Sequence, residues 1–456
     1  MRYPLQQVKI GLMGLGTVGS GVMRLLRDRG EELARRNGFT LSVQKILVRD
    51  PSKPRQVPVD RALLTTNPDD ILDDPEIELV VEVMGAVEPT KSYVLRALGA
   101  KKSVVTANKE IMADHGEEVF AAAERNGVDI FFEGSVGGGI PVLRPLKESL
   151  AGNRIFRVTG IINGTTNYIL TKMTQEGQTF QQALAEATRL GYAEPDPTAD
   201  VEGYDAARKL AILSSIAYQA RVQSRNVRTE GITRLTPTDI EYGKRRGWSL
   251  KLLAESSEHD GRVDAWVAPV FIDRNHPLAK VDDVLNAILV EGEGIGETMF
   301  YGRGAGSLPT GSAVLGDIIQ AARHRRREVS FTTCTCFRDV TVGGPEESPA
   351  RFYLRIEVEK RSGLPAEVVR SLERWGIGLE RMDYRDLPPS RAEVVLVTQE
   401  APESRARTAI EALGRAPWLV SMGMPIRVEA EEERAPAGES ASGEKLERRV
   451  LAAGGR

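Results

Sequence analysis

Histidine and cysteine are scarce in this chain of 456 residues, which holds four histidines and two cysteines. Cys334 and Cys336 form a lone C-x-C, too few for a four-ligand zinc site and poorly spaced for a strain-free mutual disulfide. No two histidines have a metal-ligand spacing. These absences fit a reducing compartment, and they leave lysine and carboxylates as the expected actors in any chemistry.

Long apolar runs and a strong charge of one sign are also missing. No uninterrupted stretch of about 18 apolar residues occurs, and the N-terminus has no signal-peptide pattern, so we expect a cytoplasmic protein without a membrane partner. The net charge of -3 argues against a nucleic-acid partner. The basic run Arg323 to Glu328 is interpreted as a solvated helix end rather than a nucleic-acid patch.

The pattern along the chain predicts about three domains. Over residues 1–150, short β-branched runs alternate with amphipathic segments, which predicts an α/β Rossmann-type domain with a parallel sheet, completed by about 305–328. Residues 151–304 mix strands with long helical stretches, notably 180–190 and 199–218, and predict an α+β domain.

The last third of the chain divides into three further segments. Residues 331–350 have little periodicity and are predicted to be a linker. Residues 351–429 show the order βαββαβ, which is a ferredoxin-like pattern. Residues 430–456 are charged, small and nearly free of large apolar side chains, so we expect a disordered tail.

A G-x-G-x-x-G lies between the first predicted strand and helix, at Gly14, Gly16 and Gly19. Glycines there permit a tight turn, close approach to a pyrophosphate and helix–strand packing, and the helix N-terminus attracts phosphate. A purely structural turn is the alternative. After the second predicted strand come Arg49 and Asp50. The acidic residue would suit the ribose of NAD and the arginine the 2′-phosphate of NADP, so NADP is favoured with NAD possible.

Two polar stretches stand at points where ligands of such sheets bind. Lys109 ends the strand-like run VVTANK, although a solvated surface lysine would look the same. The run from Glu133 to Ile140 contains three consecutive glycines, whose backbone could face a ligand or a hard cation. A flexible hinge is the alternative interpretation for this run.

A third stretch, from Glu194 to Lys209, holds five carboxylates ahead of a lysine. A helix from about residue 199 would place Glu202, Asp205 and Lys209 on one face. An ordinary surface ion pair between Asp205 and Lys209 is one interpretation. The other is that carboxylates bind a substrate ammonium while Lys209 moves a proton at the reacting oxygen.

Several long segments resemble homoserine dehydrogenase closely and occur in its order. They are VVTANK, FEGSVGGGIPVLRPLKESLAGNRI, GIINGTTNYIL, GYAEPDPTADVEGYDAARKLAIL and YGRGAGSLPTGSAVLGDI. The resemblance as a whole stretches from residue 8 to about 325. The resemblance implies a monofunctional NAD(P)-dependent oxidoreductase that interconverts L-homoserine and L-aspartate 4-semialdehyde. This reaction belongs to threonine, methionine and isoleucine biosynthesis. It also implies a homodimer or higher homo-oligomer, with 151–304 as the catalytic and dimerisation domain.

The same resemblance implies roles for individual residues. Lys209 would donate and accept the proton, with Lys109 assisting. The substrate would be held by Glu194, Asp205, Asp200, Gly164 and Thr165. The cofactor would be lined by Gly14, Gly16, Thr17, Val18, Gly19, Arg49, Lys109, Gly191, Gly306 and Thr310. A monovalent cation, sodium or potassium, would be bound by Glu133, Val136, Gly138 and Ile140.

The C-terminal segment resembles an ACT regulatory module, but its first loop departs from that pattern. Lys360 and Arg361 stand where an acidic or amide residue usually helps to hold an effector's ammonium. This argues against threonine feedback and favours a role in assembly. Two alternative functions are a non-catalytic dinucleotide-dependent amino-acid sensor and a different semialdehyde dehydrogenase with a thiol nucleophile. The second needs an activated cysteine, and both cysteines fall in the predicted linker.

Overall fold

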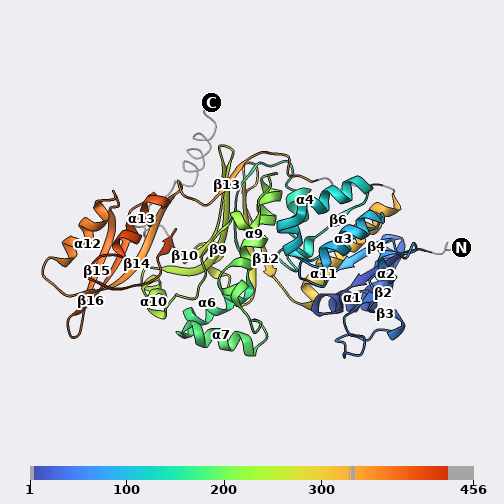
Figure 1. Ribbon diagram of the computed structural model, residues 1–456, viewed down its shortest axis with the longest axis horizontal. Helices are drawn as coiled ribbons and strands as arrows, with labels where there is room; N and C mark the ends of the chain where they lie inside the picture. Colours follow the sequence, from blue (N-terminus) through green and yellow to red (C-terminus); the bar gives the residue numbers. More distant parts are fainter. Residues whose placement is uncertain (1–4, 328, 330–333, 430–456) are drawn as a thin grey trace.

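The computed structural model describes residues 5–327, 329 and 334–429. The N-terminal and C-terminal parts of the chain lie at opposite ends of the molecule, with a large sheet and α9 between them (Figure 1). The predicted tail, 430–456, and part of the predicted linker lie outside the described residues. None of the helices in the described part of the chain has the length and apolar content needed to cross a membrane.

The N-terminal part is built on a parallel sheet with the order β3-β2-β1-β4-β5-β6. Its strands are β1 (Gln6–Met13), β2 (Phe39–Leu47), β3 (Leu64–Thr65), β4 (Leu79–Glu82), β5 (Ser103–Thr106) and β6 (Ile130–Phe131). The order reverses between β1 and β4, so a crevice opens there at the carboxyl ends of the strands, where ligands of such sheets bind. The sheet confirms the predicted Rossmann-type architecture.

Helices cover both faces of this sheet, and every residue of β4 and β5 is therefore buried. They are α1 (Thr17–Asn37), α2 (Asp69–Leu72), α3 (Thr90–Gly99), α4 (Lys109–Asn126) and α11 (Ser307–Arg326), with short 3-10 turns η1 (Arg61–Leu63) and η2 (Glu133–Ser135). Although α11 is distant in sequence, it packs on α1: a Cβ added to Gly21 would lie 2.0 Å from the carbonyl oxygen of Ser307.

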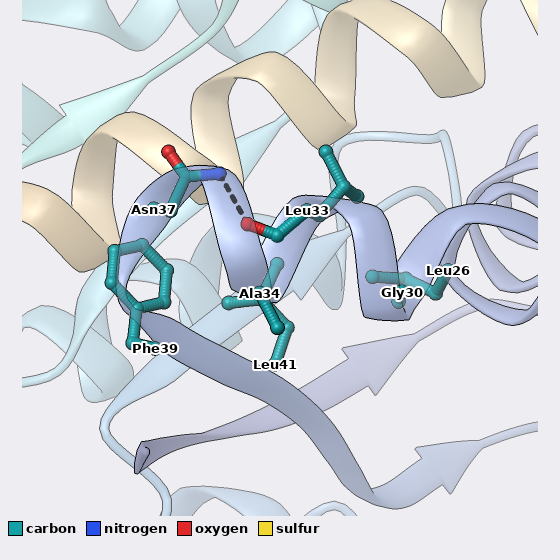
Figure 2. A pocket seen from close by; sticks show the side chains of 7 residues that line it. All are labelled: Leu26, Gly30, Leu33, Ala34, Asn37, Phe39 and Leu41. Carbon is teal, nitrogen blue, oxygen red and sulfur yellow. Dashed lines mark hydrogen bonds between the residues drawn. The ribbon is translucent and has the colours of Figure 1, made fainter. Parts of the chain in front are cut away.

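A tight turn joins α1 to β2, and Figure 2 shows the side chains around it. Gly38 ends the helix with a φ of 77°, and the Asn37 side chain donates a hydrogen bond of 2.8 Å to the Leu33 carbonyl. Together with neighbouring apolar groups, Phe39 and Leu41 enclose a hollow of only about 10 Å³. This is about the room of one water molecule, so the hollow is a small packing gap and not a ligand site.

The middle of the chain contributes strands and helices to a second sheet. The strands are β7 (Ile155–Ile161), β8 (Arg228–Thr229), β9 (Trp248–His259), β10 (Arg262–Asp273), β11 (Leu285–Gly292) and β12 (Gly296–Arg303). The helices are α5 (Leu143–Lys147), α6 (Gly164–Glu176), α7 (Phe180–Arg189), α8 (Thr198–Val201), α9 (Tyr204–Ala217) and α10 (Pro237–Arg245), with turns η3 (Ser224–Asn226) and η4 (Pro277–Lys280). The path through this part of the sheet runs β12-β11-β7-β9-β10.

One predicted helix is two helices in the structure. The sequence predicted a single helix over 199–218, but Gly203 adopts a φ of 84° and separates α8 from α9. The predicted common face is therefore wrong at Glu202, whose carboxylate accepts a hydrogen bond from Thr233 instead of lying beside Lys209. On α9, Leu210 and Ala211 are fully buried.

The C-terminal part continues the middle sheet, because β19 pairs with both β10 and β14. Its elements are β13 (Thr341–Gly343), β14 (Pro349–Glu359), α12 (Leu364–Glu373), β15 (Leu379–Leu387), β16 (Arg391–Thr398), β17 (Ala401–Pro402), α13 (Glu403–Leu413), β18 (Leu419–Met422) and β19 (Ile426–Val428). The predicted linker 331–350 therefore missed a strand, since β13 pairs with β10. Three residues are too few for a visible periodicity.

Candidate active site

The turn between β1 and α1 is shaped by its glycines. Gly14 has a φ of 104°, and a Cβ there would meet the Val83 carbonyl oxygen at 2.8 Å. A Cβ at Gly19 would lie 2.2 Å from the carbonyl oxygen of Gly14. A Cβ added at Gly16, in contrast, would have no atom within 4 Å, so this side of the turn is open. The turn thus combines close internal packing with room for a phosphate at the exposed N-terminus of α1, beside Thr17 and Val18.

A second helix N-terminus lies next to this turn. Gly306 precedes α11 with a φ of 122°, and its carbonyl accepts from the backbone N–H of Thr310. Because Ser307 touches Gly21 of α1, the first turns of the two helices lie side by side. Two positive helix ends near one open turn favour a bound anion. Gly191, predicted to line the same cofactor, ends α7 in an exposed position with a φ of 77°.

The loop after β2 separates the two residues that could read the cofactor's ribose. The Asp50 carboxylate accepts hydrogen bonds from the backbone N–H and the hydroxyl of Ser52, and the Ser52 hydroxyl lowers its pKa below the ordinary value. The guanidinium of Arg55 donates to the Asp50 carbonyl. Arg49 is exposed. The carboxylate is therefore engaged within its own loop, while an arginine faces solvent at the crevice edge.

The two predicted catalytic lysines converge on one carboxylate. Lys109 is the first residue of α4, and its Nζ lies 3.1 Å from Oδ1 of Asp205. Lys209 lies one turn after Asp205 on α9, and its Nζ donates to Oδ2 of Asp205 at 2.6 Å and to the Ile162 carbonyl at 2.9 Å. Asp205 is buried and Lys209 is mostly covered, which makes this more than a solvated surface pair.

Asn163 connects Asp205 with a second acid. Its Nδ2 donates to Asp200 at 2.7 Å and to Asp205 at 2.9 Å, while its Oδ1 accepts from the backbone N–H of Thr166 and caps α6. Gly164 and Thr165 of this loop were predicted to bind substrate, whereas Asn163 itself was not. The available signal was its position, since an asparagine directly before a helical segment is a typical N-cap.

The electrostatics of the cluster differ from residue to residue. Burial alone would raise the pKa of Asp205, but Lys209 and Lys109 outweigh it and hold that pKa far below its usual range. Burial and the Asp205 charge raise the pKa of Asp200. Asp205 raises the pKa of Lys109, against the effect of burial. Asp205 is therefore a permanent anion at neutral pH, and Lys109 is an ammonium in the unliganded site.

Lys109 is placed by a chain of buried groups that begins at Glu82, the last residue of β4. The Glu82 carboxylate accepts from the Thr106 hydroxyl, and that hydroxyl accepts from the backbone N–H of Asn108 at 2.9 Å. Asn108 then caps α4 by accepting from the Ile111 N–H. Burial raises the pKa of Glu82. Glu82 was not predicted as a site residue. In the run LVVEVM, residues 79–84, a buried acid that positions a helix looks the same as an exposed acid at the end of a strand.

The other predicted substrate residues are not all brought together. Thr165 is buried, and its hydroxyl donates to the Tyr192 carbonyl at 2.7 Å. Gly164 begins α6 next to Asn163. Glu194 is exposed on the loop before α8, and it makes no hydrogen bond or ion pair with the other described residues of the cluster. Its predicted role depends on a ligand or a loop movement that brings it closer.

The glycine-rich run after β6 is built around the Glu133 carboxylate. Its two oxygens accept from the backbone N–H groups of Val142, Leu143 and Arg144, at 2.6, 2.9 and 2.8 Å, and so cap α5. Gly137 and Gly138 have φ values of 71° and 54°. Within the described residues there is no group of three His, Cys, Asp or Glu side chains that could hold a metal ion. A cation here would depend on backbone carbonyls, because the carboxylate is occupied.

Comparison with known proteins gives a consistent family. The family model "Homoserine dehydrogenase, NAD binding domain" matches residues 14–133, and the model "Homoserine dehydrogenase" matches residues 141–319. The chain is 44% identical over 433 residues to the homoserine dehydrogenase of Corynebacterium glutamicum, covering 93% of this chain and 96% of the relative.

Solved structures agree with the sequence comparison. A homoserine dehydrogenase from Thiobacillus denitrificans is similar with a TM-score of 0.86 and 38% identity, covering 93% of this chain and 99% of that one. A hyperthermophilic archaeal homoserine dehydrogenase in complex with NADPH is similar with a TM-score of 0.59 and 29% identity, covering 70% of this chain and 98% of that one. The open glycine turn fits a nicotinamide dinucleotide, and the chain belongs to the homoserine dehydrogenase family of oxidoreductases.

Proposed function

We propose that this enzyme interconverts L-homoserine and L-aspartate 4-semialdehyde with Lys209 as the group that moves the proton. The observation that carries the proposal is the convergence of Lys109 and Lys209 on the buried Asp205. When bound, the nicotinamide dinucleotide supplies the hydride chemistry. The protein's part is to position the substrate and transfer one proton, and no covalent intermediate is needed.

In this proposal Lys209 accepts the proton of the homoserine hydroxyl and returns it in the reverse direction. Its Nζ donates to the Ile162 carbonyl and to Asp205, which leaves the third direction of the nitrogen, a lone pair in the neutral amine, for the substrate hydroxyl. Lys109 assists from the other side of the same carboxylate. Asp205, Asp200 and Glu194 supply negative charge for the substrate's ammonium, with Gly164 and Thr165 at the edge of the site.

Arg49 supports NADP as the preferred dinucleotide. The Asp50 carboxylate is engaged by Ser52, whereas the guanidinium of Arg49 is exposed and available to a 2′-phosphate. The substitution Arg49→Gln should raise the Kd of NADP⁺ about tenfold, the effect of losing one such contact, and leave that of NAD⁺ nearly unchanged. Equal weakening of both would show that Arg49 does not contact the 2′-phosphate.

The loop from Glu133 to Ile140 is proposed to hold a sodium or potassium ion. The backbone carbonyls of Val136, Gly138 and Ile140 are its candidate ligands, since oxygen donors suit hard cations. Glu133 would act on the loop's shape, through the three N–H groups that it accepts. Replacing potassium by a bulky quaternary ammonium ion at equal ionic strength should then lower activity.

The C-terminal part, with its strand path β19-β14-β16-β15 and two helices, is proposed to be an ACT-like domain that serves assembly. The two cations of its first loop are paired within the domain, Lys360 with Asp386 at 2.7 Å and Arg361 with Glu367 at 2.5 Å. Added threonine should therefore leave activity unchanged. We propose a homodimer formed through the middle sheet, which light scattering can test.

The central experiment follows homoserine-dependent NADP⁺ reduction for the enzyme and three variants. Lys209→Ala should lower kcat at least about a hundredfold, the scale of lost acid–base catalysis. Lys209→Arg keeps the charge but cannot give up a proton, so it should fail as badly. Lys172→Ala removes a lysine paired with Glu176 on α6 and is the matched control.

The outcomes separate the candidate functions. Activity restored by arginine would make Lys209 a charge that holds the substrate and not a proton carrier. A folded protein that binds NADP⁺ but reduces none in the presence of homoserine would favour the dinucleotide-dependent sensor. Activity that depends on a cysteine and on an acyl acceptor would favour a thiol-dependent semialdehyde dehydrogenase.

A further inference from the structure

Residues 334–338, here called the crossing segment, run against the end of α9. The backbone N–H of Arg338 donates to the Gln219 carbonyl at 2.9 Å, just beyond the helix. Cys336 Sγ donates to the Ser215 carbonyl at 3.8 Å, within the helix. The crossing segment is thereby fastened to α9, the helix that carries Lys209. Although the two cysteines fall in the predicted linker, they share a cavity with Met112 of α4 in the N-terminal domain.

A cavity of about 40 Å³ lies where the crossing segment meets α4 and α9. Met112 of α4 and Ile212 of α9 line it, three residues beyond Lys109 and Lys209 respectively. The cavity therefore lies one helical turn further along the two helices that present the catalytic lysines. Its remaining wall includes Cys334, Thr335, Cys336, Lys147 and Arg221.

The two thiols lie in an electropositive environment. Arg221 donates from its Nη2 to Cys334 Sγ at 3.9 Å, with Glu117 on its outer side at 3.4 Å. Lys147 reaches the same cavity with its Nζ 4.0 Å from the centre of the Phe132 ring. The guanidinium beside the Cys334 sulfur stabilises a thiolate there, and Lys147 is a second cation at the same cavity.

The surroundings of the two thiols distinguish them. Cys336 and then Arg221, whose Nη2 lies 3.9 Å from the Cys334 sulfur, lower the pKa of Cys334 well below its usual range, against the effect of burial. Cys334, together with burial, raises the pKa of Cys336, whose S–H donates to the Ser215 carbonyl. Cys334, the thiol beside the guanidinium, is therefore the nucleophile of the pair. Both are half-buried, so a small reagent can reach them.

We propose that Cys334 is a modification site: a reactive thiol that forms mixed disulfides with small disulfides and thereby lowers the enzyme's activity. The Cys334 thiolate attacks one sulfur of the reagent R–S–S–R. The reagent's S–S bond breaks, a Cys334–S–S–R bond forms, and the leaving thiolate takes a proton from solvent. One disulfide bond breaks and one forms: the leaving R–S half is reduced to a thiol, the Cys334 sulfur is oxidised in exchange, and the other R–S half stays at the disulfide level.

The effect on activity follows from the size of the cavity. A cysteinyl or glutathionyl group is far larger than about 40 Å³, so the part of it that enters the cavity beside Met112 and Ile212 must displace a neighbour. Because the crossing segment is bonded to α9, the added group should change the packing of α9 on α4. Lys109 and Lys209 approach the same carboxylate across that contact, so their spacing should change with it.

The test uses the full-length enzyme treated with glutathione disulfide and with a chromogenic aromatic disulfide. At about pH 6.5 we expect Cys334 to react about tenfold faster than the thiols of the urea-unfolded chain, because much more of it is thiolate. Peptide mapping should place the adduct on Cys334. Arg221→Gln should slow the reaction and move its pH midpoint upward, whereas Glu117→Gln, which keeps the guanidinium, should not.

Activity provides the second measurement. Modification should lower kcat, a thiol reductant should restore it, and Cys334→Ser should keep its activity throughout the treatment. Modification at Cys336, reaction no faster than in the unfolded chain, or full activity of the singly modified enzyme would each overturn the proposal. Because Cys334 lies outside the lysine cluster, these results do not depend on whether homoserine is the substrate.

Discussion

Asp205 raises the pKa of Lys109, and its removal should be visible in the pH dependence of the reaction. In Asp205→Asn the pKa of Lys109 should fall, so the part of the rise of kcat with pH to which Lys109 contributes should move to lower pH while the plateau of kcat decreases. Asp205→Glu keeps the charge and should leave the midpoint in place. An unmoved midpoint in Asp205→Asn would mean that Lys109 takes no part in the proton transfer.

Asn163 combines a helix cap with a bridge between two acids, and substitutions can separate these roles. Asn163→Asp keeps the cap but places a third carboxylate beside Asp200 and Asp205. In the unsubstituted enzyme these two acids lie 2.7 and 2.9 Å from the amide nitrogen of Asn163. Denaturant unfolding at neutral pH should show a loss of about 1–3 kcal/mol, which diminishes on acidification. Asn163→Ser keeps a capping oxygen without the charge and should lose less. If both variants lose a similar free energy of unfolding and the loss does not change with pH, Asn163 acts as a helix cap alone.

At the scale of elements, the contact of α1 with α11 supports the cofactor turn. A Cβ on Gly21 would lie 2.0 Å from the Ser307 carbonyl oxygen and cannot be relieved by a side-chain rotation. Gly21→Ala should therefore lower the free energy of unfolding by about 1–3 kcal/mol and weaken dinucleotide binding. Gly30→Ala on the same helix meets nothing within 4 Å and should stabilise by about 0.5–1 kcal/mol. Equal behaviour of the two variants would contradict the packing argument.

Elements with a strong period were predictable from the sequence, and those defined by partners were not. The strand and glycine turn before α1 follow from local pattern, as does α7. The two-residue strand β3 and the three-residue β13 exist only because a neighbouring strand pairs with them. The break at Gly203 was hidden because a glycine among good helix formers can continue a helix or end it, and tertiary contacts decide.

The candidate site shows the same division. The motif residues Lys109, Asp205 and Lys209 were predictable and do meet. The roles of their buried supports, Glu82 and Asn163, could not be predicted from the sequence, because those roles lie in hydrogen bonds to groups tens of residues away. The position of Asn163 indicates a helix cap but not the bridge between two acids. The use of the Glu133 carboxylate as a cap of α5 could likewise not be predicted from the sequence.

For the whole molecule, the joint between the middle and C-terminal parts is polar as well as continuous in its sheet. Arg157 of β7 lies 2.6 Å from Glu255 of β9 and 3.3 Å from Glu429, the residue after β19. On the same joint, the buried Glu403 of α13 pairs with Arg427. Removing one member of such a network leaves an uncompensated charge, so this joint should respond to pH more strongly than the apolar cores do.

Glu429 is the group through which that response should act. Burial and the neighbouring Glu255 raise the pKa of Glu429 from 4.5 to about 7, against the effect of Arg157. A carboxyl with a raised pKa in the folded state contributes stability that is complete below its unfolded pKa. That contribution is lost as the pH rises through the folded value. The enzyme should therefore lose part of its stability between about pH 5 and pH 8 through this single group.

Glu429→Gln cannot ionise, so its unfolding free energy should fall less than that of the unsubstituted enzyme over the same interval. Comparing the two by thermal or denaturant unfolding at about pH 5 and pH 8 isolates the effect, because any hydrogen bond lost to Arg427 or Arg157 is lost at both. Glu293→Gln, an exposed acid whose ion pair is with Arg154, is the matched control and should follow the unsubstituted curve. If the unfolding free energy of Glu429→Gln also follows that of the unsubstituted enzyme, Glu429 is ionised over the whole interval from about pH 5 to pH 8. The joint is then held by ion pairs that do not change in this interval.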